Sequence, residues 1–234
     1  MNSATRDRVT LSVSDGTTMS AYVARPESGN LRSGILVLQE AFGVNSQIRS
    51  VSDRLAKQGY VAIAPELFHR TAPGFEGDYK NFQATPPHIQ AMTMAGMEAD
   101  LRAAFDWLRS QSSIGKDEIF SVGFCMGGRV SFIANSILPL HAAVSFYGGR
   151  IAPDLLNRAA DMQSPILFFW GGHDHHITPE QRSAVTRALD AAGKTYADVV
   201  FSNADHGFFN EEREAYHPQA ARQAWSLMLE FLRS

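Results

Sequence analysis

The sequence predicts an α/β fold in which helices cover both faces of a mainly parallel central sheet. Three observations lead to this prediction. Strand patterns and helix patterns alternate along most of the 234 residues. Residues 34–38 form a short, continuously apolar run, which is typical of a strand buried on both faces. Residues 118–122 form a strand-like run that is mostly apolar, and a glycine-rich turn at 123–128 follows it directly.

The first third of the chain contains a hairpin pattern and one strand–helix–strand pattern. The turn residues at 14–16 separate two strand-like segments, 9–13 and 21–24, and predict a β-hairpin. After the strand at 34–38, residues 47–58 predict a helix with apolar residues at helical spacing, and Gly59 ends it. Residues 60–64 predict the next strand, which ends at Pro65.

Residues 68–87 have a composition unlike the segments around them. They are rich in Gly, Pro, Asp and Thr and show no clear period. Loops of this length in compact domains are usually functional, so we expect a substrate-facing lid segment. A helix is expected over residues 89–110, where methionines and leucines recur at helical spacing, a pattern typical of core packing.

The second half repeats the alternation of strands and helices. Strands are predicted at 142–146, 166–170 and 195–201, and helices at 179–192 and 218–232. The sequence contains no internal repeat or linker-like stretch, so residues 1–234 are expected to form a single domain. In such folds ligands bind at the carboxyl ends of the strands.

Composition and charge exclude several classes of protein. The formal net charge of −3 lacks the basic excess typical of nucleic-acid binding, and one cysteine allows no intrachain disulfide. No segment approaches the run of about 20 apolar residues that a membrane helix needs, and residues 1–8 lack the apolar stretch of a signal peptide. We therefore expect a cytoplasmic monomer or small homo-oligomer that acts on a small molecule and binds neither nucleic acid nor membrane.

The turn at 123–128 has the pattern of a nucleophile elbow, Gly-x-nucleophile-x-Gly, with Cys125 where serine is usual. A nucleophile at such a corner sits in strained backbone, and the flanking glycines avoid clashes with the neighbouring strand and helix. The N-terminus of the following helix favours negative charge, and therefore a thiolate, at this position. The sequence predicts that Cys125 is a catalytic nucleophile. The alternative is a small buried apolar residue.

A nucleophile on an elbow needs a histidine base and a carboxylate that orients it. In this architecture the chain order is nucleophile, acid, histidine. Asp174 follows the predicted strand 166–170, and His206 follows the predicted strand 195–201. These two residues are therefore the predicted acid and base.

Each assignment has an alternative. The cluster at 173–176, with three histidines around Asp174, could bind a metal ion, but adjacent side chains point in different directions and chelate poorly, so no metal is expected. Asp174 could instead cap the helix that begins near Thr178. Asp205 is a rival acid, although a side chain next to His206 in sequence seldom reaches its imidazole properly.

Glu40 stands at the carboxyl end of the apolar strand 34–38. Burying a carboxylate there costs several kcal/mol unless it is protonated or paired. Its place near the expected active site predicts a catalytic role. The alternative is a carboxylate that simply accepts hydrogen bonds from the loop that follows.

Four motifs, taken together, resemble the dienelactone hydrolase (carboxymethylenebutenolidase) family. The order and spacing of the motifs match over nearly the whole chain, and four motifs in register are far more specific than any one of them. The four are residues 39–45 (QEAFGVN), 123–128 (GFCMGG), 171–174 (GGHD) and 205–208 (DHGF).

The resemblance implies an α/β-hydrolase fold and an ester or lactone hydrolase that needs no cofactor. It implies a Cys125–His206–Asp174 triad that works through a thioester acyl-enzyme, with the backbone N–H groups of Met126 and Ala41 as the oxyanion hole. It also implies that Glu40 hydrogen-bonds the resting thiol and takes up its proton when substrate displaces it.

The sequence departs from the family where the family grips a substrate carboxylate with two arginines. The first matching position is Asn210, and residues 71–91, in and beyond the predicted lid, contain no arginine. A neutral or differently charged ester or lactone therefore fits at least as well as a dienelactone. We expect it to bind near Asn210, framed by three aromatic residues: Phe42, Phe208 and Phe209.

Two other classes of function compete with hydrolysis. A non-catalytic member of the fold could bind a small ligand in the same pocket, but such proteins usually lose a triad residue, and this chain has all three candidates. A redox sensor based on Cys125 would lack a second cysteine to resolve a sulfenic acid.

Overall fold

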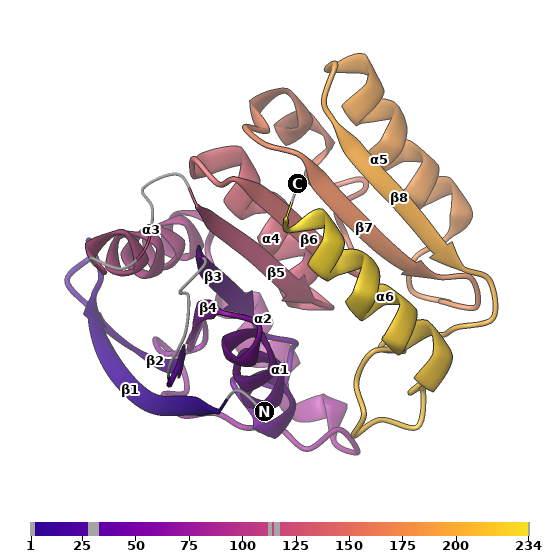
Figure 1. Cartoon of the computed structure of the whole chain (residues 1–234). Helices are drawn as coiled ribbons and strands as arrows, with labels where there is room; N and C mark the ends of the chain where they lie inside the picture. Colours follow the sequence, from indigo (N-terminus) through magenta and orange to yellow (C-terminus); the bar gives the residue numbers. More distant parts are fainter. Residues whose placement is uncertain (1–2, 28–32, 112–113, 115–117, 234) are drawn as a thin grey trace. The chain divides into compact units, whose positions relative to one another are not determined.

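The computed structural model describes residues 3–27, 33–111, 114 and 118–233 (Figure 1). Residues 1–2 of the segment analysed for a signal peptide lie outside this range. The chain divides into two compact units, residues 1–120 and 121–234, and passes from one to the other within strand β5 (Ile119–Phe124).

The first unit is built on four strands in the order β1-β2-β4-β3. The predicted hairpin is confirmed and is longer than expected, because β1 (Ala4–Ser12) and β2 (Thr18–Pro26) pair antiparallel along nine residues each. Strand β2 also pairs antiparallel with β4 (Tyr60–Pro65), and β4 pairs in parallel with β3 (Ser33–Leu38). Every residue of β3 and β4 is buried, as their apolar runs predict.

Helix α1 (Ser46–Lys57) connects β3 to β4 and confirms the predicted helix. Asn45 caps it by accepting a hydrogen bond from the backbone N–H of Ile48, and the apolar stripe at 48, 51 and 55 is buried. A capped helix with a buried stripe on one side leaves its other side, which carries several charged residues, to solvent.

The prediction of a single helix over residues 89–110 is wrong. The chain instead forms a short 3₁₀ turn (Phe82–Ala84), helix α2 (Pro86–Ala91) and helix α3 (Met94–Ser110). The break occurs because Met92 is extended and the Thr93 side chain accepts a hydrogen bond from Gly96 N, which starts a new helix. The expected core packing of this stripe is confirmed for Met97 and Leu101.

The second unit holds the remaining strands in the order β5-β6-β7-β8. Strand β6 (Ala142–Phe146) pairs in parallel with β7 (Ile166–Gly171), and β7 with β8 (Tyr196–Phe201). Helix α4 (Met126–Ile137) follows β5, helix α5 (Pro179–Ala191) connects β7 to β8, and helix α6 (Pro218–Phe231) ends the chain (Figure 1). These bounds confirm the predicted strands and helices. A 3₁₀ turn (Leu156–Asp161) was not predicted.

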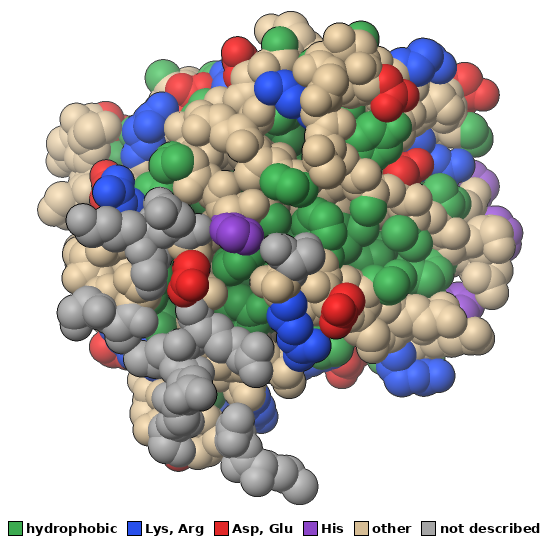
Figure 2. Space-filling model, turned by 45° about the horizontal axis from the view of Figure 1, so that its top comes forward, with side chains coloured by type: hydrophobic (Ala, Val, Ile, Leu, Met, Phe, Trp, Pro, Cys, Tyr) green, Lys and Arg blue, Asp and Glu red, His purple; other side chains and the backbone are tan. Residues whose placement is uncertain are grey.

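The surface carries both signs of charge, as the composition suggests. On the face drawn in Figure 2, Lys and Arg side chains are interspersed with Asp and Glu rather than gathered into one basic field. Across the described part of the chain, none of the helices has the length and apolar character that crossing a bilayer requires.

Candidate active site

Cys125 lies at the corner between β5 and α4 and has the backbone conformation of a nucleophile elbow. Its φ is 55°, in the left-handed region that non-glycine residues rarely adopt, and its N–H donates to the carbonyl of Phe146 on β6 (3.0 Å). A Cβ on Gly123 would lie 1.8 Å from the carbonyl oxygen of Gly127, and one on Gly128 2.6 Å from that of Phe146. Both glycines are therefore required by close backbone contacts; Gly123 is the first glycine of the motif, and Gly128 follows its second, Gly127.

His206 and Asp174 meet at the carboxyl ends of neighbouring strands. The distance from His206 Nδ1 to Asp174 Oδ2 is 2.8 Å. The other carboxylate oxygen accepts hydrogen bonds from the backbone N–H groups of His176 (2.8 Å) and Ile177 (3.2 Å). Asp174 is buried, and its two oxygens are held by three donors, so the carboxylate is oriented before any substrate arrives.

The alternatives for this carboxylate can now be compared. Thr178, not Asp174, caps helix α5 and completes a capping box with Gln181. Asp205 is exposed, while Asp174 takes the hydrogen bond of His206. Among the described residues, no group of three or more His, Cys, Asp or Glu side chains is arranged to hold a metal ion.

The electrostatics of His206 link it to the cysteine. Burial lowers the pKa of His206, but the negative charge of Cys125 and the hydrogen bond to Asp174 outweigh burial and raise it to about 10. The Cys125 side chain also hydrogen-bonds the imidazole. Because Nδ1 is engaged by Asp174, this bond uses Nε2. The raised pKa favours a protonated imidazole beside the sulfur of Cys125.

Two residues beside His206 were missed at the level of sequence. The ring of Tyr147 lies 5.1 Å from that of His206. Tyr147 is fully buried, and its backbone φ is 39°. The ring of His176 approaches His206 edge-on at 5.2 Å. Tyr147 directly follows β6 and precedes two glycines, so its place at the carboxyl end of a strand was a usable signal.

The predicted substrate residues of this unit lie in its core. Phe208, Phe209 and Asn210 are at most 1% exposed. The ring of Phe209 stacks 5.2 Å from that of Phe124, and Asn210 Oδ1 accepts a hydrogen bond from the N–H of Glu212 (2.9 Å). These contacts tie Phe209 and Asn210 into the interior of the unit. Their contact with substrate stays a prediction.

In the first unit, Glu40 is 1% exposed and is the second residue after β3. Its Oε2 accepts a hydrogen bond from the hydroxyl of Tyr79 (3.2 Å), which in turn accepts one from Asn45 Nδ2 (2.7 Å). Phe42, also buried, packs its ring 4.6 Å from that of Tyr79. Tyr79 lies in the segment predicted as a lid, so this segment contributes a hydrogen-bond donor to Glu40.

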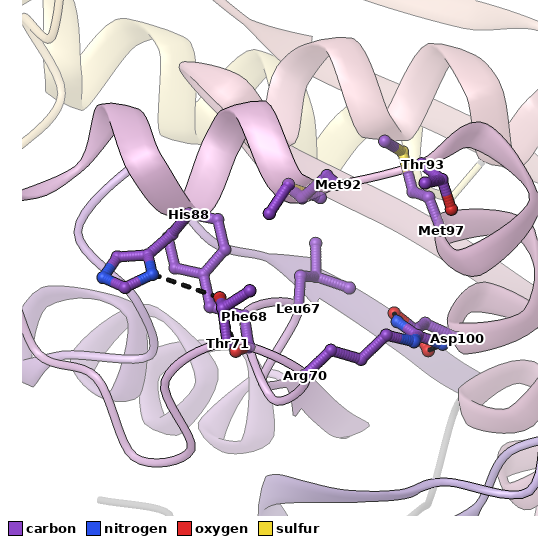
Figure 3. A pocket seen from close by; sticks show the side chains of 10 residues that line it. Leu67, Phe68, Arg70, Thr71, His88, Met92, Thr93, Met97 and Asp100 are labelled. Atoms are coloured by element: carbon purple, nitrogen blue, oxygen red, sulfur yellow. Dashed lines mark hydrogen bonds and ion pairs between the residues drawn. The ribbon is translucent and has the colours of Figure 1, made fainter.

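The predicted lid is anchored where it begins. The rings of Phe75 and His88 lie 4.7 Å apart, and Arg70 forms two 2.8 Å hydrogen bonds with Asp100 on α3. Figure 3 shows Arg70, His88 and Asp100 among the side chains around a small cavity. Its volume of about 20 Å³ holds about one water molecule and no substrate. A lid function of residues 68–87 stays a prediction.

Comparison with known proteins now identifies the family. Residues 19–234 match the model of the dienelactone hydrolase family. The chain belongs to this family. It is 34% identical over 232 residues to an Escherichia coli (strain K12) protein named "Putative carboxymethylenebutenolidase", covering 94% of this chain and 84% of the relative. A Synechocystis protein of the same name is 33% identical over 221 residues, 88% of each chain.

Solved structures agree with this assignment of the chain to the dienelactone hydrolase family. A crystal structure from Klebsiella pneumoniae, named "Putative Dienelactone Hydrolase", superimposes with a TM-score of 0.86 at 30% identity and covers 98% of this chain and 99% of that one. Acylaminoacyl peptidase from Pyrococcus horikoshii shares the fold alone, with a TM-score of 0.75 at 15% identity over 99% of this chain and 41% of its own. The dienelactone hydrolase family member described here therefore has an α/β-hydrolase fold. It is a hydrolase that acts on ester or lactone bonds.

Proposed function

We propose that this protein hydrolyses small carboxylic esters or lactones through a Cys125–His206–Asp174 triad and a thioester acyl-enzyme. The observation that carries the proposal is the 2.8 Å hydrogen bond between His206 and a buried Asp174. Cys125 of the elbow is hydrogen-bonded to the same imidazole. This is the nucleophile–base–orienting acid arrangement that covalent acyl transfer requires.

In the first half-reaction, the Cys125 thiolate attacks the carbonyl carbon and the carbonyl electron pair moves to oxygen. The oxyanion collapses, the C–O bond to the leaving group breaks, and His206 Nε2 gives that oxygen its proton. Asp174 holds the imidazole in the tautomer that this step needs and stabilises the imidazolium beforehand. The product of this step is a thioester on Cys125.

In the second half-reaction, water attacks the thioester. Neutral His206 removes a proton from the water through Nε2, the C–S bond breaks, and the thiolate and carboxylic acid are released. The backbone N–H of Met126 is the first of helix α4, where N–H groups lack intrahelical partners, and we propose it as one oxyanion donor. Ala41 as the second donor and Glu40 as a proton acceptor rest on the family resemblance and stay predictions.

The decisive experiment combines turnover with intact mass. Parent protein is mixed with p-nitrophenyl acetate, or with a dienelactone, and quenched early. We expect a mass increase of one acyl group on Cys125 and release of the acid. Cys125→Ala should lose the adduct and at least about 10⁴-fold in turnover, with an unchanged circular dichroism spectrum. Retained turnover in this variant would contradict the proposal.

The pair of substrates separates the finer possibilities. If the protein turns over p-nitrophenyl acetate but not the dienelactone, it is an esterase with a different substrate. This outcome would agree with Asn210 at the position of a family arginine. Dienelactone turnover would show that the missing arginines are not needed. Absence of both turnover and adduct would favour a protein that only binds a ligand.

A further inference from the structure

A second cavity, far larger than the one in Figure 3, lies within the first unit alone. Its volume is about 500 Å³, which is within the range of about 300–1,000 Å³ of small-molecule sites. It lies between the outer side of α1 and strands β1 and β2, which supply Arg6 and Tyr22. We call it the basic groove. It includes none of the residues proposed for catalysis.

The charge of this groove is opposite to that of the whole chain. Four cationic side chains line it with one carboxylate, Asp53, and Glu76 outside the lining pairs with Arg49, while the chain has a formal net charge of −3. The cations are Arg6, Arg49, Arg54 and Lys57. Such an excess of one sign inside a concave surface raises the local concentration of the opposite ion.

The one carboxylate is neutralised by its own neighbours. Asp53 Oδ2 accepts a hydrogen bond from Arg6 Nε (2.7 Å), and Oδ1 accepts one from the hydroxyl of Tyr22 (2.7 Å). Tyr22 is 7% exposed, and burial together with the bond to Asp53 raises the pKa of its phenol to about 12, so it remains a donor at neutral pH. Because Arg6 and Tyr22 compensate the negative charge of Asp53, this carboxylate repels an incoming anion less than an unpaired one would.

The remaining cations are spread along the helix. Arg49 is held by Glu76 (2.5 and 3.1 Å) and by the carbonyl of Val44 (2.7 Å) near the start of α1. Arg54 and Lys57 lie in its last turn. Eight residues separate 49 from 57, which corresponds to about 12 Å along a helix. The hydroxyls of two serines, 46 and 50, add neutral donors to the same wall.

We propose that the basic groove binds a soluble small molecule that carries several anionic groups, such as phosphates or carboxylates, spread along its length. Single charged contacts at an exposed surface bind weakly, whereas an extended anion contacts several cations at once. A phosphate-bearing ligand is the better fit, because guanidinium groups pair with phosphate oxygens through two parallel hydrogen bonds.

The test uses inorganic tripolyphosphate as the probe and calorimetric titration as the readout. The parent protein should bind tripolyphosphate more tightly than orthophosphate at equal ionic strength. Arg54→Ala/Lys57→Ala should weaken tripolyphosphate binding at least about tenfold. The matched control, Arg102→Ala/Arg187→Ala, removes two exposed positive charges from other helices and should bind as the parent does.

Several outcomes would overturn the proposal. No binding of tripolyphosphate by the parent, or equal weakening in the groove variant and the control, would exclude a specific site. Binding to vesicles that contain phosphatidylserine without binding to tripolyphosphate would assign the groove to a membrane surface instead. None of these measurements uses turnover, so they stand apart from the proposed hydrolysis, and the groove variant should keep the ester activity of the parent.

Discussion

Among the described residues, two His–Asp pairs look alike and are set up for different tasks. In the second unit, His206 Nδ1 lies 2.8 Å from Asp174. In the first, His69 Nε2 lies 3.0 Å from Asp100. The difference lies in what else each carboxylate and each imidazole contacts.

Asp100 already has a cation beside it. Arg70 donates to both of its oxygens at 2.8 Å and continues to Asp15 on the hairpin turn (2.8 Å). This pair therefore joins the start of the predicted lid to helix α3. Asp174 has only neutral backbone donors besides His206, and the imidazole contacts a cysteine at a strained elbow. A buried His–Asp pair becomes a candidate catalytic pair through its neighbours, not through its own geometry.

The strongest way to test this contrast is Asp174→Asn. The amide keeps the shape of the side chain but cannot stabilise the imidazolium, so kcat should fall by about 10³–10⁴-fold with a much smaller change in KM. Asp205→Asn, which alters the exposed neighbouring carboxylate, is the control and should stay within about threefold of the parent. If the two variants lost activity equally, the orienting acid would not be Asp174.

The charge of His206 provides a second test. A folded-state pKa of about 10 means that the imidazole stays protonated well above the usual value of 6.5. NMR titration of the parent should show this, and Cys125→Ala should lower the pKa because it removes the negative charge and the hydrogen bond that raise it. An unchanged titration in Cys125→Ala would show that the cysteine does not act on His206.

The same shift has a consequence for stability. Because the folded pKa is raised, the stabilisation from protonated His206 is fully present below about pH 6.5 and disappears as the pH rises towards 10. The free energy of unfolding of the parent should therefore fall relative to that of Cys125→Ala over this range, as measured by urea titration at several pH values.

The smallest effect on activity is expected from a change in the His69–Asp100 pair. Asp100→Asn should lower the free energy of unfolding by about 2 kcal/mol, since it weakens charged hydrogen bonds to Arg70 and His69. Ester turnover should stay within about threefold of the parent. Asp106→Asn changes an exposed carboxylate on the same helix and should alter neither quantity. A large loss of turnover in Asp100→Asn would mean that this pair also serves the reaction.

Much of the fold could be predicted because the responsible signals are local. Strands β3 and β4 are apolar at almost every position and buried throughout, and the elbow glycines are required by contacts with the adjacent turn and strand. The break between α2 and α3 was missed because residues 89–93 contain no glycine or proline that would signal the end of a helix. A single side chain, Thr93, decides where the second helix begins.

Some features of the candidate site could likewise be predicted from the sequence, and others could not. The sequence by itself determined the elbow, the order of nucleophile, acid and histidine, and the resemblance to the family, because these depend on residue type and spacing. Only the tertiary structure decided the 2.8 Å hydrogen bond between Asp174 and His206, the positions of Tyr147 and His176 beside the His206 ring, and the contact that brings Arg6 of β1 to the three cations of α1. Those contacts join residues from different strands and helices, and their distances follow from how the chain packs, which spacing along the sequence does not encode.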